Sequence, residues 1–354
     1  MKKIKVLVVD DSALMRKIIS DMIDEESTME VIATARNGED LLKKLEKIDI
    51  EPDVITLDVE MPKMDGIEAL CALKKKNKDI PVIMLSSLSK SGAGLTMECL
   101  EKGAFDFVPK PSGAISLDIG KVKEELIKKI KLASRRNNSN STIKKQSKVE
   151  SNKKNKESFN IKDYKKNNIE AIVIGASTGG PKALYKVITK FPKVMNMPIF
   201  VVQHMPKSFT KAFADRLNSN SKIHVVEAED GQTISNDVVY VAPGGFHMEI
   251  GKDRKIHLNT NPPIWGVRPA VDKLFKTASN IYGSKLLSVV LTGMGKDGSE
   301  GTAYIKDNGG ITISEDKSTC TIYGMPKAAF ETGKVDMVIP LNEITDTIMN
   351  IIRS

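Results

Sequence analysis

A serine flanked by glycines stands at the centre of the chain. The run Ala171–Ile174 is rich in β-branched residues and predicts a buried strand, and Pro181 opens a helical pattern over Lys182–Lys190. Between them, residues 175–180 read Gly-Ala-Ser-Thr-Gly-Gly. A strand, a Gly-rich turn and a helix together can present Ser177 as a nucleophile. The same pattern also suits a phosphate-binding loop or a plain turn, so the turn alone leaves all three open.

A serine nucleophile needs an imidazole to accept its proton and a carboxylate to hold that imidazole. His204 stands at the end of the predicted strand Pro198–Val202, and Asp297 lies in the Gly-rich loop after the predicted strand Leu286–Thr292. The carboxyl ends of parallel strands meet at one edge of a sheet. We therefore expect Ser177, His204 and Asp297 to converge there.

The other three of the four histidines are weaker candidates for the base. His247 follows a Pro-Gly-Gly loop and is a second candidate, whereas His224 in an alternating strand and His257 in a predicted hairpin suit structural or exposed positions. Dinucleotide binding is disfavoured because the spacing of Gly175, Gly179 and Gly180 is not Gly-x-Gly-x-x-Gly. No acidic residue ends a strand about 20 residues further on, as that fold requires.

A second set of chemical groups follows the predicted strands of the amino-terminal part. Asp10, Asp11, Asp58, Ser86 and Lys110 all stand at strand ends. Three converging carboxylates suit Mg²⁺, and the lysine supplies a point charge opposite them. A carboxylate held in this way can accept a phosphoryl group, which gives an aspartyl phosphate.

The elements that must position these residues alternate between strand and helix. Two doubly wound parallel α/β domains are expected, the first flavodoxin-like and the second Rossmann-like with an inserted hairpin over Met248–Leu258. Their bounds are 1–134 and 169–354, and a flexible linker over 135–168 joins them because that segment is rich in Asn, Ser and Lys. The last helix of the first domain is expected over Gly120–Ser134.

The net charge of +9 is concentrated in the linker. Residues 1–134 have a net charge of −2, residues 135–168 of +8 and residues 169–354 of +3. With a net charge of only +3 and no helix-turn-helix pattern in the second domain, a DNA-binding output is disfavoured, and no nucleic-acid partner is expected. There is no long apolar run and no signal peptide, and the three cysteines are far apart. These features predict a cytoplasmic protein without membrane insertion.

The first 134 residues resemble a bacterial response-regulator receiver domain. The resemblance rests on Asp10-Asp11, Asp58, Met61-Pro62 with Asp65-Gly66, Ser86 and Lys110-Pro111. It implies that Asp58 accepts phosphate from a histidine kinase. It also implies that Asp10, Asp11, Asp58 and the backbone carbonyl of Glu60 hold Mg²⁺, and that Ser86, Phe107 and Lys110 respond to the phosphoryl group.

Residues 169–354 resemble the catalytic domain of the chemotaxis protein-glutamate methylesterase (CheB) family. The motifs are Gly-Ala-Ser177-Thr-Gly-Gly, Gln-His204-Met-Pro, Ala-Pro-Gly-Gly-x-His247, Arg268-Pro-x-Val-Asp and Thr-Gly-Met-Gly-x-Asp297-Gly. The resemblance implies a serine hydrolase that demethylates glutamate methyl esters, and deamidates certain glutamines, on chemoreceptors.

The same resemblance implies a division of labour within the site. Ser177 attacks, His204 transfers the proton and Asp297 orients His204, without a cofactor. The backbone N–H groups of Thr178 and Met294 are candidates for the oxyanion hole. The receiver is expected to inhibit this site until Asp58 is phosphorylated.

Overall fold

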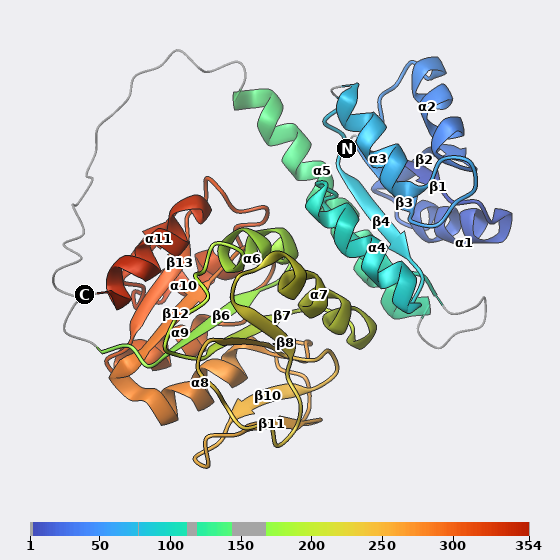
Figure 1. Ribbon diagram of the computed structural model, residues 1–354. Helices are drawn as coiled ribbons and strands as arrows, with labels where there is room; N and C mark the ends of the chain where they lie inside the picture. Colours follow the sequence, from blue (N-terminus) through green and yellow to red (C-terminus); the bar gives the residue numbers. More distant parts are fainter. Residues whose placement is uncertain (1–2, 77, 112–118, 144–167, 354) are drawn as a thin grey trace. The chain divides into compact units, whose positions relative to one another are not determined.

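The computed structural model describes residues 3–76, 78–111, 119–143 and 168–353, with the side chains of 136–143 left aside. The chain divides into two compact units, Met1–Asn152 and Lys153–Ser354 (Figure 1). Each unit is built on its own sheet, and each is described by itself. Within the described residues, no helix is both long enough and apolar enough to cross a bilayer.

The amino-terminal unit contains a five-stranded parallel sheet in the order β2-β1-β3-β4-β5. This is the flavodoxin-like order, so the expected fold is confirmed. The central strands are apolar because helices cover both faces of the sheet. The strands are β1 (Ile4–Val9), β2 (Met29–Ala35), β3 (Val54–Asp58), β4 (Val82–Ser86) and β5 (Asp106–Pro109).

The helices of this unit begin at side-chain caps that the sequence supplies. Ser12 Oγ accepts a hydrogen bond from Met15 N–H, and Asp65 and Glu68 form a reciprocal capping box. The helices are α1 (Ala13–Asp24), α2 (Gly38–Lys47), α3 (Gly66–Lys75), α4 (Lys90–Glu101) and α5 (Ile119–Ile143).

Helix α5 continues through residues 135–143, which the sequence had placed in the linker. No glycine or proline interrupts this stretch, and extending an existing helix is far less costly than nucleating a new one. The remaining linker, residues 144–167, lies outside the described residues.

The carboxy-terminal unit contains a seven-stranded parallel sheet in the order β14-β13-β12-β6-β7-β9-β8. The inserted hairpin expected over Met248–Leu258 forms a separate antiparallel pair, β10 and β11. The three-residue strand β14 is an addition to the expected set. The strands are β6 (Ala171–Ala176), β7 (Ile199–Gln203), β8 (His224–Glu227), β9 (Val238–Val241), β10 (His247–Ile250), β11 (Ile256–Asn259), β12 (Leu286–Val290), β13 (Ile311–Glu315) and β14 (Met337–Ile339).

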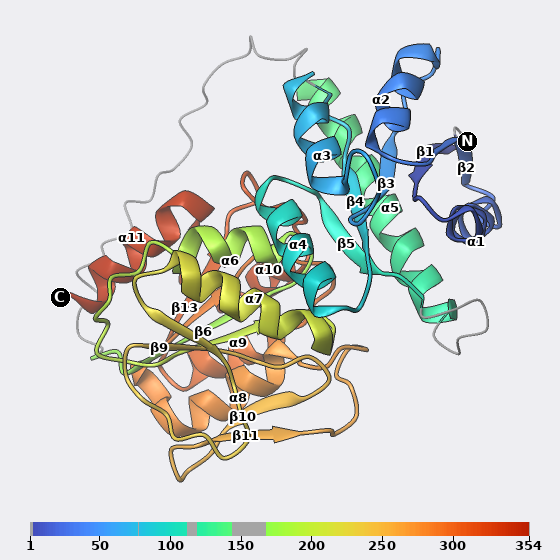
Figure 2. The ribbon, with the colours of Figure 1, turned by 45° about the vertical axis from the view of Figure 1, so that its right-hand side comes forward.

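Helices cover both faces of this sheet, with α6, α7 and α11 on one face and α8 and α9 on the other (Figure 2). The chain leaves β6 towards β7 and later returns to the other side of β6 through β12. The order of the strands therefore reverses between β6 and β12, which is where open α/β sheets bind ligands. The helices are α6 (Gly180–Ile188), α7 (Lys207–Asn220), α8 (Val271–Tyr282), α9 (Ser299–Asp307), α10 (Met325–Glu331) and α11 (Leu341–Ile352).

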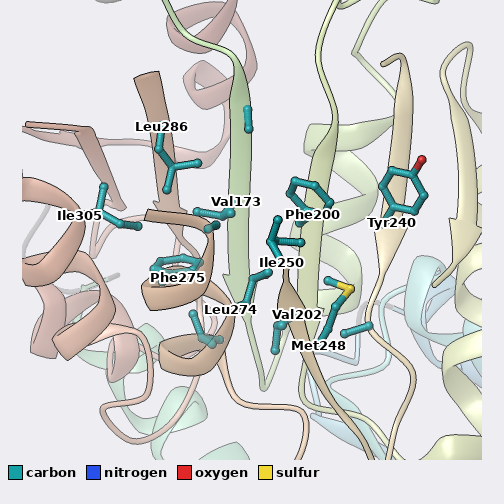
Figure 3. Packing of buried hydrophobic residues seen from close by; sticks show 14 of the residues in the cluster. Val173, Phe200, Val202, Tyr240, Met248, Ile250, Leu274, Phe275, Leu286 and Ile305 are labelled. Atoms are coloured by element: carbon teal, nitrogen blue, oxygen red, sulfur yellow. The ribbon is translucent and has the colours of Figure 1, made fainter. Parts of the chain in front are cut away.

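One apolar core joins the sheet, helix α8 and the hairpin (Figure 3). Phe275 of α8 and Met248 of β10 are fully buried against it, and the rings of Phe200 and Tyr240 stack 5.6 Å apart. Burying one such side chain contributes roughly 1.5–3 kcal/mol. Because the hairpin and α8 share this core with the strands, the loop between them is held at the site edge.

Candidate active site

Three loops at the carboxyl edge of the second sheet bring the candidate triad together. Ser177 follows β6, His204 follows β7 and Asp297 lies between β12 and α9. Strand β6 pairs with β7 on one side and with β12 on the other. The backbone also ties the loops together, because Ser177 N–H donates to Thr292 O at 3.0 Å.

His204 and Asp297 are in direct contact, with Nε2 of the imidazole 2.8 Å from Oδ2 of the carboxylate. Because an ionised carboxylate only accepts hydrogen bonds, Nε2 carries the proton in the neutral ring and Nδ1 keeps its lone pair. The nitrogen left for a serine is therefore Nδ1. In the chymotrypsin-type triad the carboxylate takes Nδ1 instead, so the two nitrogens exchange roles here.

The Ser177 hydroxyl makes no hydrogen bond within the described part of the chain. Its side chain is half-buried at the turn, and the main chain around it is firmly held. Catalytic hydrogen bonds of enzymes without substrate are often long and tighten only when substrate binds. The Ser177 hydroxyl is thus not engaged elsewhere, and its loop is joined to the loop of His204 through the Gln203 amide.

Asp297 is held in its ionised form at the start of helix α8. Its carboxylate accepts N–H hydrogen bonds from Val271 at 2.6 Å and Asp272 at 2.9 Å, where the helix dipole favours negative charge. Burial alone would raise the pKa of Asp297. The hydrogen bond and charge of His204 and the two N–H donors outweigh burial and lower that pKa. The side chain can thus stabilise an imidazolium.

A second buried carboxylate is Asp272, the last residue of the Arg268-Pro-x-Val-Asp motif, for which the sequence suggested no role. Its Oδ1 accepts hydrogen bonds from the N–H groups of Gly298 at 3.0 Å and Gly301 at 2.7 Å, and its Oδ2 accepts from the Trp265 indole at 2.9 Å. Burial, and then the charge of Asp297, raise the pKa of Asp272 to about 6. Asp272 fixes the loop that carries Asp297. Its place in the first turn of a helix was the available signal.

Gln203 is another positioning residue that the sequence analysis did not single out. Its buried side-chain amide donates to the backbone carbonyls of Ser177 and His204, both at 3.0 Å. One amide therefore holds the two loops at a fixed separation. The signal was its position at the end of β7, directly before the candidate base.

The N–H groups proposed for the oxyanion hole belong to Thr178 and Met294. Among the described residues neither of these N–H groups donates a hydrogen bond, so both are free to bind an oxyanion. Thr292 Oγ1 donates to the carbonyl of Thr178 at 3.0 Å and links the two loops. A side chain at Gly293 would lie 2.9 Å from Ser177 Cβ and 2.3 Å from Met325 Sδ, so only glycine fits.

The structure assigns His247 a structural position. The ring is fully buried, its Nδ1 accepts from Ala270 N–H at 3.2 Å, and its Nε2 donates to Pro262 O at 3.1 Å. With both nitrogens in use it has no lone pair for a serine. His224 and His257 are exposed on β8 and β11, where they contact Asn218 and Asp253.

The strand-end carboxylates of the first unit form a compact oxygen cluster. Oxygen atoms of Asp10, Asp11 and Asp58 lie within 4.8 Å of one another. Lys110 Nζ lies 2.7 Å from Asp10 and 2.6 Å from Asp58. Burial raises the pKa of Asp58 to about 6, although Lys110 lowers it, and the charge of Asp10 adds to the rise. The cluster carries more negative charge than one lysine offsets, and hard oxygen donors suit Mg²⁺.

Two of the expected responding residues, Ser86 and Phe107, lie on β4 and β5, the strands that follow β3 in the sheet. The buried Ser86 hydroxyl accepts a hydrogen bond at 2.6 Å from Oγ1 of Thr96, in the middle of α4. Phe107 is buried, with Lys129 Nζ 5.1 Å from its ring centroid. The Glu60 N–H lies 3.4 Å from Asp58 Oδ1, which places that backbone segment beside the acceptor carboxylate.

An acidic cluster with a lysine at the strand ends of one sheet and a Ser-His-Asp constellation on the other are the features of a response regulator with a hydrolase-type output unit. Residues 6–118 match the response regulator receiver domain, and residues 172–348 match the CheB methylesterase family. The chain belongs to the CheB methylesterase family.

Similar proteins cover the chain from end to end. A protein-glutamate methylesterase/protein-glutamine glutaminase of Clostridium acetobutylicum is 59% identical over 100% of this chain and 99% of its own length. One from Pyrococcus horikoshii is 46% identical over 99% of this chain and 94% of its own. The crystal structure of the Thermotoga maritima CheB methylesterase catalytic domain is 45% identical with a TM-score of 0.50, covering 52% of this chain and 99% of its own.

Proposed function

We propose that this chain is a phosphorylation-regulated hydrolase that demethylates glutamate methyl esters, and deamidates certain glutamines, on chemoreceptors. The observation that carries the proposal is the ionised Asp297 bound to His204, in a loop that the Gln203 amide joins to the loop of Ser177. Ester and amide hydrolysis are both acyl transfer, so one site serves both reactions.

The reaction proceeds in two halves. Ser177 Oγ attacks the acyl carbon while its proton passes to Nδ1 of His204, and the N–H groups of Thr178 and Met294 bind the oxyanion. Collapse of the intermediate breaks the bond to the leaving oxygen, which takes the proton from His204 and departs as methanol. Water then attacks the acyl-enzyme by the same route and releases a glutamate carboxylate. From a glutamine the leaving group is ammonia.

The receiver domain supplies control. A histidine kinase transfers phosphate to Asp58. Asp10, Asp11, Asp58 and the carbonyl of Glu60 would hold Mg²⁺, which would supply positive charge beside the phosphoryl group. Lys110 pairs with that group as a point charge. Ser86 and Phe107 then shift and release inhibition of the catalytic unit. The proposed partners place the protein in the cytoplasm.

The direct test is methanol release from a methylated chemoreceptor, measured with and without acetyl phosphate and Mg²⁺. The proposal requires release by the chain and faster release with the phosphodonor. No release under either condition would contradict the assigned activity.

Replacing His204 and His247 by alanine in turn separates the catalytic base from a structural histidine. We expect His204→Ala to reduce kcat by about 10⁴-fold or more, because triad members act as a unit. His247→Ala removes two buried hydrogen bonds, so we expect it to lower the melting temperature. The folded molecules of this variant should keep the turnover rate of the unmutated chain. Single-turnover rates on folded protein decide the matter. An active His204→Ala beside a folded but inactive His247→Ala would move the base to His247.

A fragment comprising residues 167–354 tests inhibition by the receiver. We expect it to release methanol faster than the unphosphorylated full chain and to ignore acetyl phosphate, because it lacks Asp58 and has its own core. Initial rates are compared at matched concentration, with the Ser177→Ala fragment as the blank. A fragment no faster than the unphosphorylated chain would instead indicate activation by contact with the receiver.

A further inference from the structure

The loops around the triad carry two exposed lysines, each paired with an aromatic ring. Lys296 Nζ lies 3.7 Å from the centroid of Trp265, and Lys207 Nζ lies 5.3 Å from that of Phe246. Lys296 directly precedes Asp297, and Lys207 is the third residue after His204. Neither pair is used by the chemical steps derived above.

Trp265 is held rigidly although its side chain is 45% exposed. Its indole N–H donates to buried Asp272 at 2.9 Å. The turn that carries it is closed by two backbone hydrogen bonds between Ile264 and Val267, with φ of 53° at Trp265 and 78° at Gly266. A large aromatic surface fixed before binding costs little entropy when a partner docks. An anchored, exposed aromatic beside a reaction centre is suited to contacting substrate.

The two pairs belong to one continuous edge. Gly245 N–H, beside Phe246, donates to Arg268 O at 3.1 Å and ties that loop to the Trp265 loop. A side chain at Gly244 would lie 2.4 Å from Lys207 N, so this loop also packs on the one after His204. We call the set the basic rim: Lys207, Phe246, Trp265, Arg268 and Lys296.

The exposed charge in the four loops that carry the basic rim is of one sign. In the four loops 204–207, 242–246, 260–270 and 291–298 the cations are Lys207, Arg268 and Lys296, and the single carboxylate is Asp297. Asp297 is only 2% exposed and is bonded to His204 and the start of α8. Exposed Lys207 and Lys296 therefore face solvent without a carboxylate in these loops to neutralise them.

We propose that the basic rim docks an acidic polypeptide segment of the substrate, rich in free glutamates around the ester. This inference rests on the proposed methylesterase function and adds how the substrate is selected. Lysines attract the neighbouring carboxylates, and Trp265 and Phe246 contact the aliphatic parts of the segment. The chemistry at Ser177 needs only an ester or amide bond, so the rim selects which polypeptide segment is hydrolysed.

Trp265 is the only tryptophan of the chain, so its fluorescence reports binding at the rim. The full chain carrying Ser177→Ala, with acetyl phosphate and Mg²⁺, is titrated with a tryptophan-free, glutamate-rich peptide bearing one glutamate γ-methyl ester. A lysine-rich peptide with the same ester is the charge control. We expect a saturable change in emission with the acidic peptide alone, and a Kd that rises with salt.

Single substitutions test whether Lys296 of the rim binds the acidic peptide. Lys296→Gln should raise the Kd for the acidic peptide about threefold or more, because it removes an exposed positive charge and its contact with the Trp265 ring. Lys296→Glu should raise the Kd further, because it repels the peptide. Lys252→Gln, exposed at the hairpin turn, is the matched control and should leave the Kd unchanged. Three outcomes would contradict the proposed rim. They are an equal Kd for the acidic and the lysine-rich peptide, no change in Trp265 emission on titration, or an equal rise in Kd in Lys252→Gln and Lys296→Gln.

Methanol release by the unmutated chain from the same acidic peptide separates this proposal from the function on which it rests. Methanol release without a change in Trp265 emission contradicts the rim but is consistent with the proposed esterase activity. A Trp265 response that depends on Lys296, without release, supports the rim and contradicts the esterase.

Discussion

Ser177→Ala should reduce methanol release from methylated receptor by about 10⁴- to 10⁶-fold, the loss typical of removing a triad nucleophile. The Thr292 hydroxyl just after β12 is already bonded to Thr178 O and to Ile322 N–H, so it is not free to replace the Ser177 hydroxyl. Without Oγ no acyl-enzyme forms, and the remaining N–H groups stabilise only direct attack by water. Deamidation should fall in parallel, because both reactions pass through the same intermediate.

The fold should survive this change. Ser177 is held through its backbone N–H and carbonyl, which alanine keeps, and its hydroxyl contributes no hydrogen bond to the described structure. Ser219→Ala, on the exposed end of α7, is the matched control and should keep full activity. Circular dichroism melts verify folding of both variants. A folded Ser177→Ala chain that retains more than a few per cent of the rate would exclude Ser177 as the nucleophile.

Asp58→Asn should eliminate stimulation by acetyl phosphate while basal methanol release continues. The asparagine amide cannot form an acyl phosphate, and no other carboxylate of the cluster is placed at the end of β3. Asparagine is also neutral, and burial already raises the pKa of Asp58 to about 6, so the fold tolerates an uncharged group there. The catalytic unit is untouched, and only the signal to it is lost.

Two measurements are needed for this variant: incorporation of labelled phosphate from acetyl phosphate, and the initial rate with and without the donor. Both responses should disappear together. Asp49→Asn, exposed after α2, is the control and should behave as the unmutated chain. Full stimulation in Asp58→Asn would place the phosphorylation site elsewhere.

The strand-end residues were the predictable part of both units. Strand β6 and the Gly-rich turn after it can be recognised from one short continuous segment. In a parallel sheet the carboxyl ends of the strands lie at one edge, independently of the conformation of the loops. The contact between His204 and Asp297, 93 positions apart, follows from that rule and is present. The doubly wound parallel architecture of each sheet likewise follows from alternating strands and helices, whereas the order of the strands does not.

The parts that escaped prediction depend on loop conformation and on single side chains. The choice of Nε2 by Asp297 depends on how one ring turns at the end of β7. The link from Trp265 through Asp272 to Gly298 needs a turn in which Trp265 and Gly266 both have positive φ. Only the glycine of this pair can be recognised in the sequence as suited to that conformation. Strand β14 is too short to show an alternating pattern.

The pairing of β12 with β6, which sets Leu286 opposite Ala171, has a consequence for how the protein is made. On the ribosome the receiver emerges first, then Ser177 and His204, and only much later the strand that delivers Asp297. Domains generally fold as units in this order. A prematurely terminated chain therefore holds a complete receiver and an incomplete triad. Translation errors of this kind yield inert product rather than an esterase without its control.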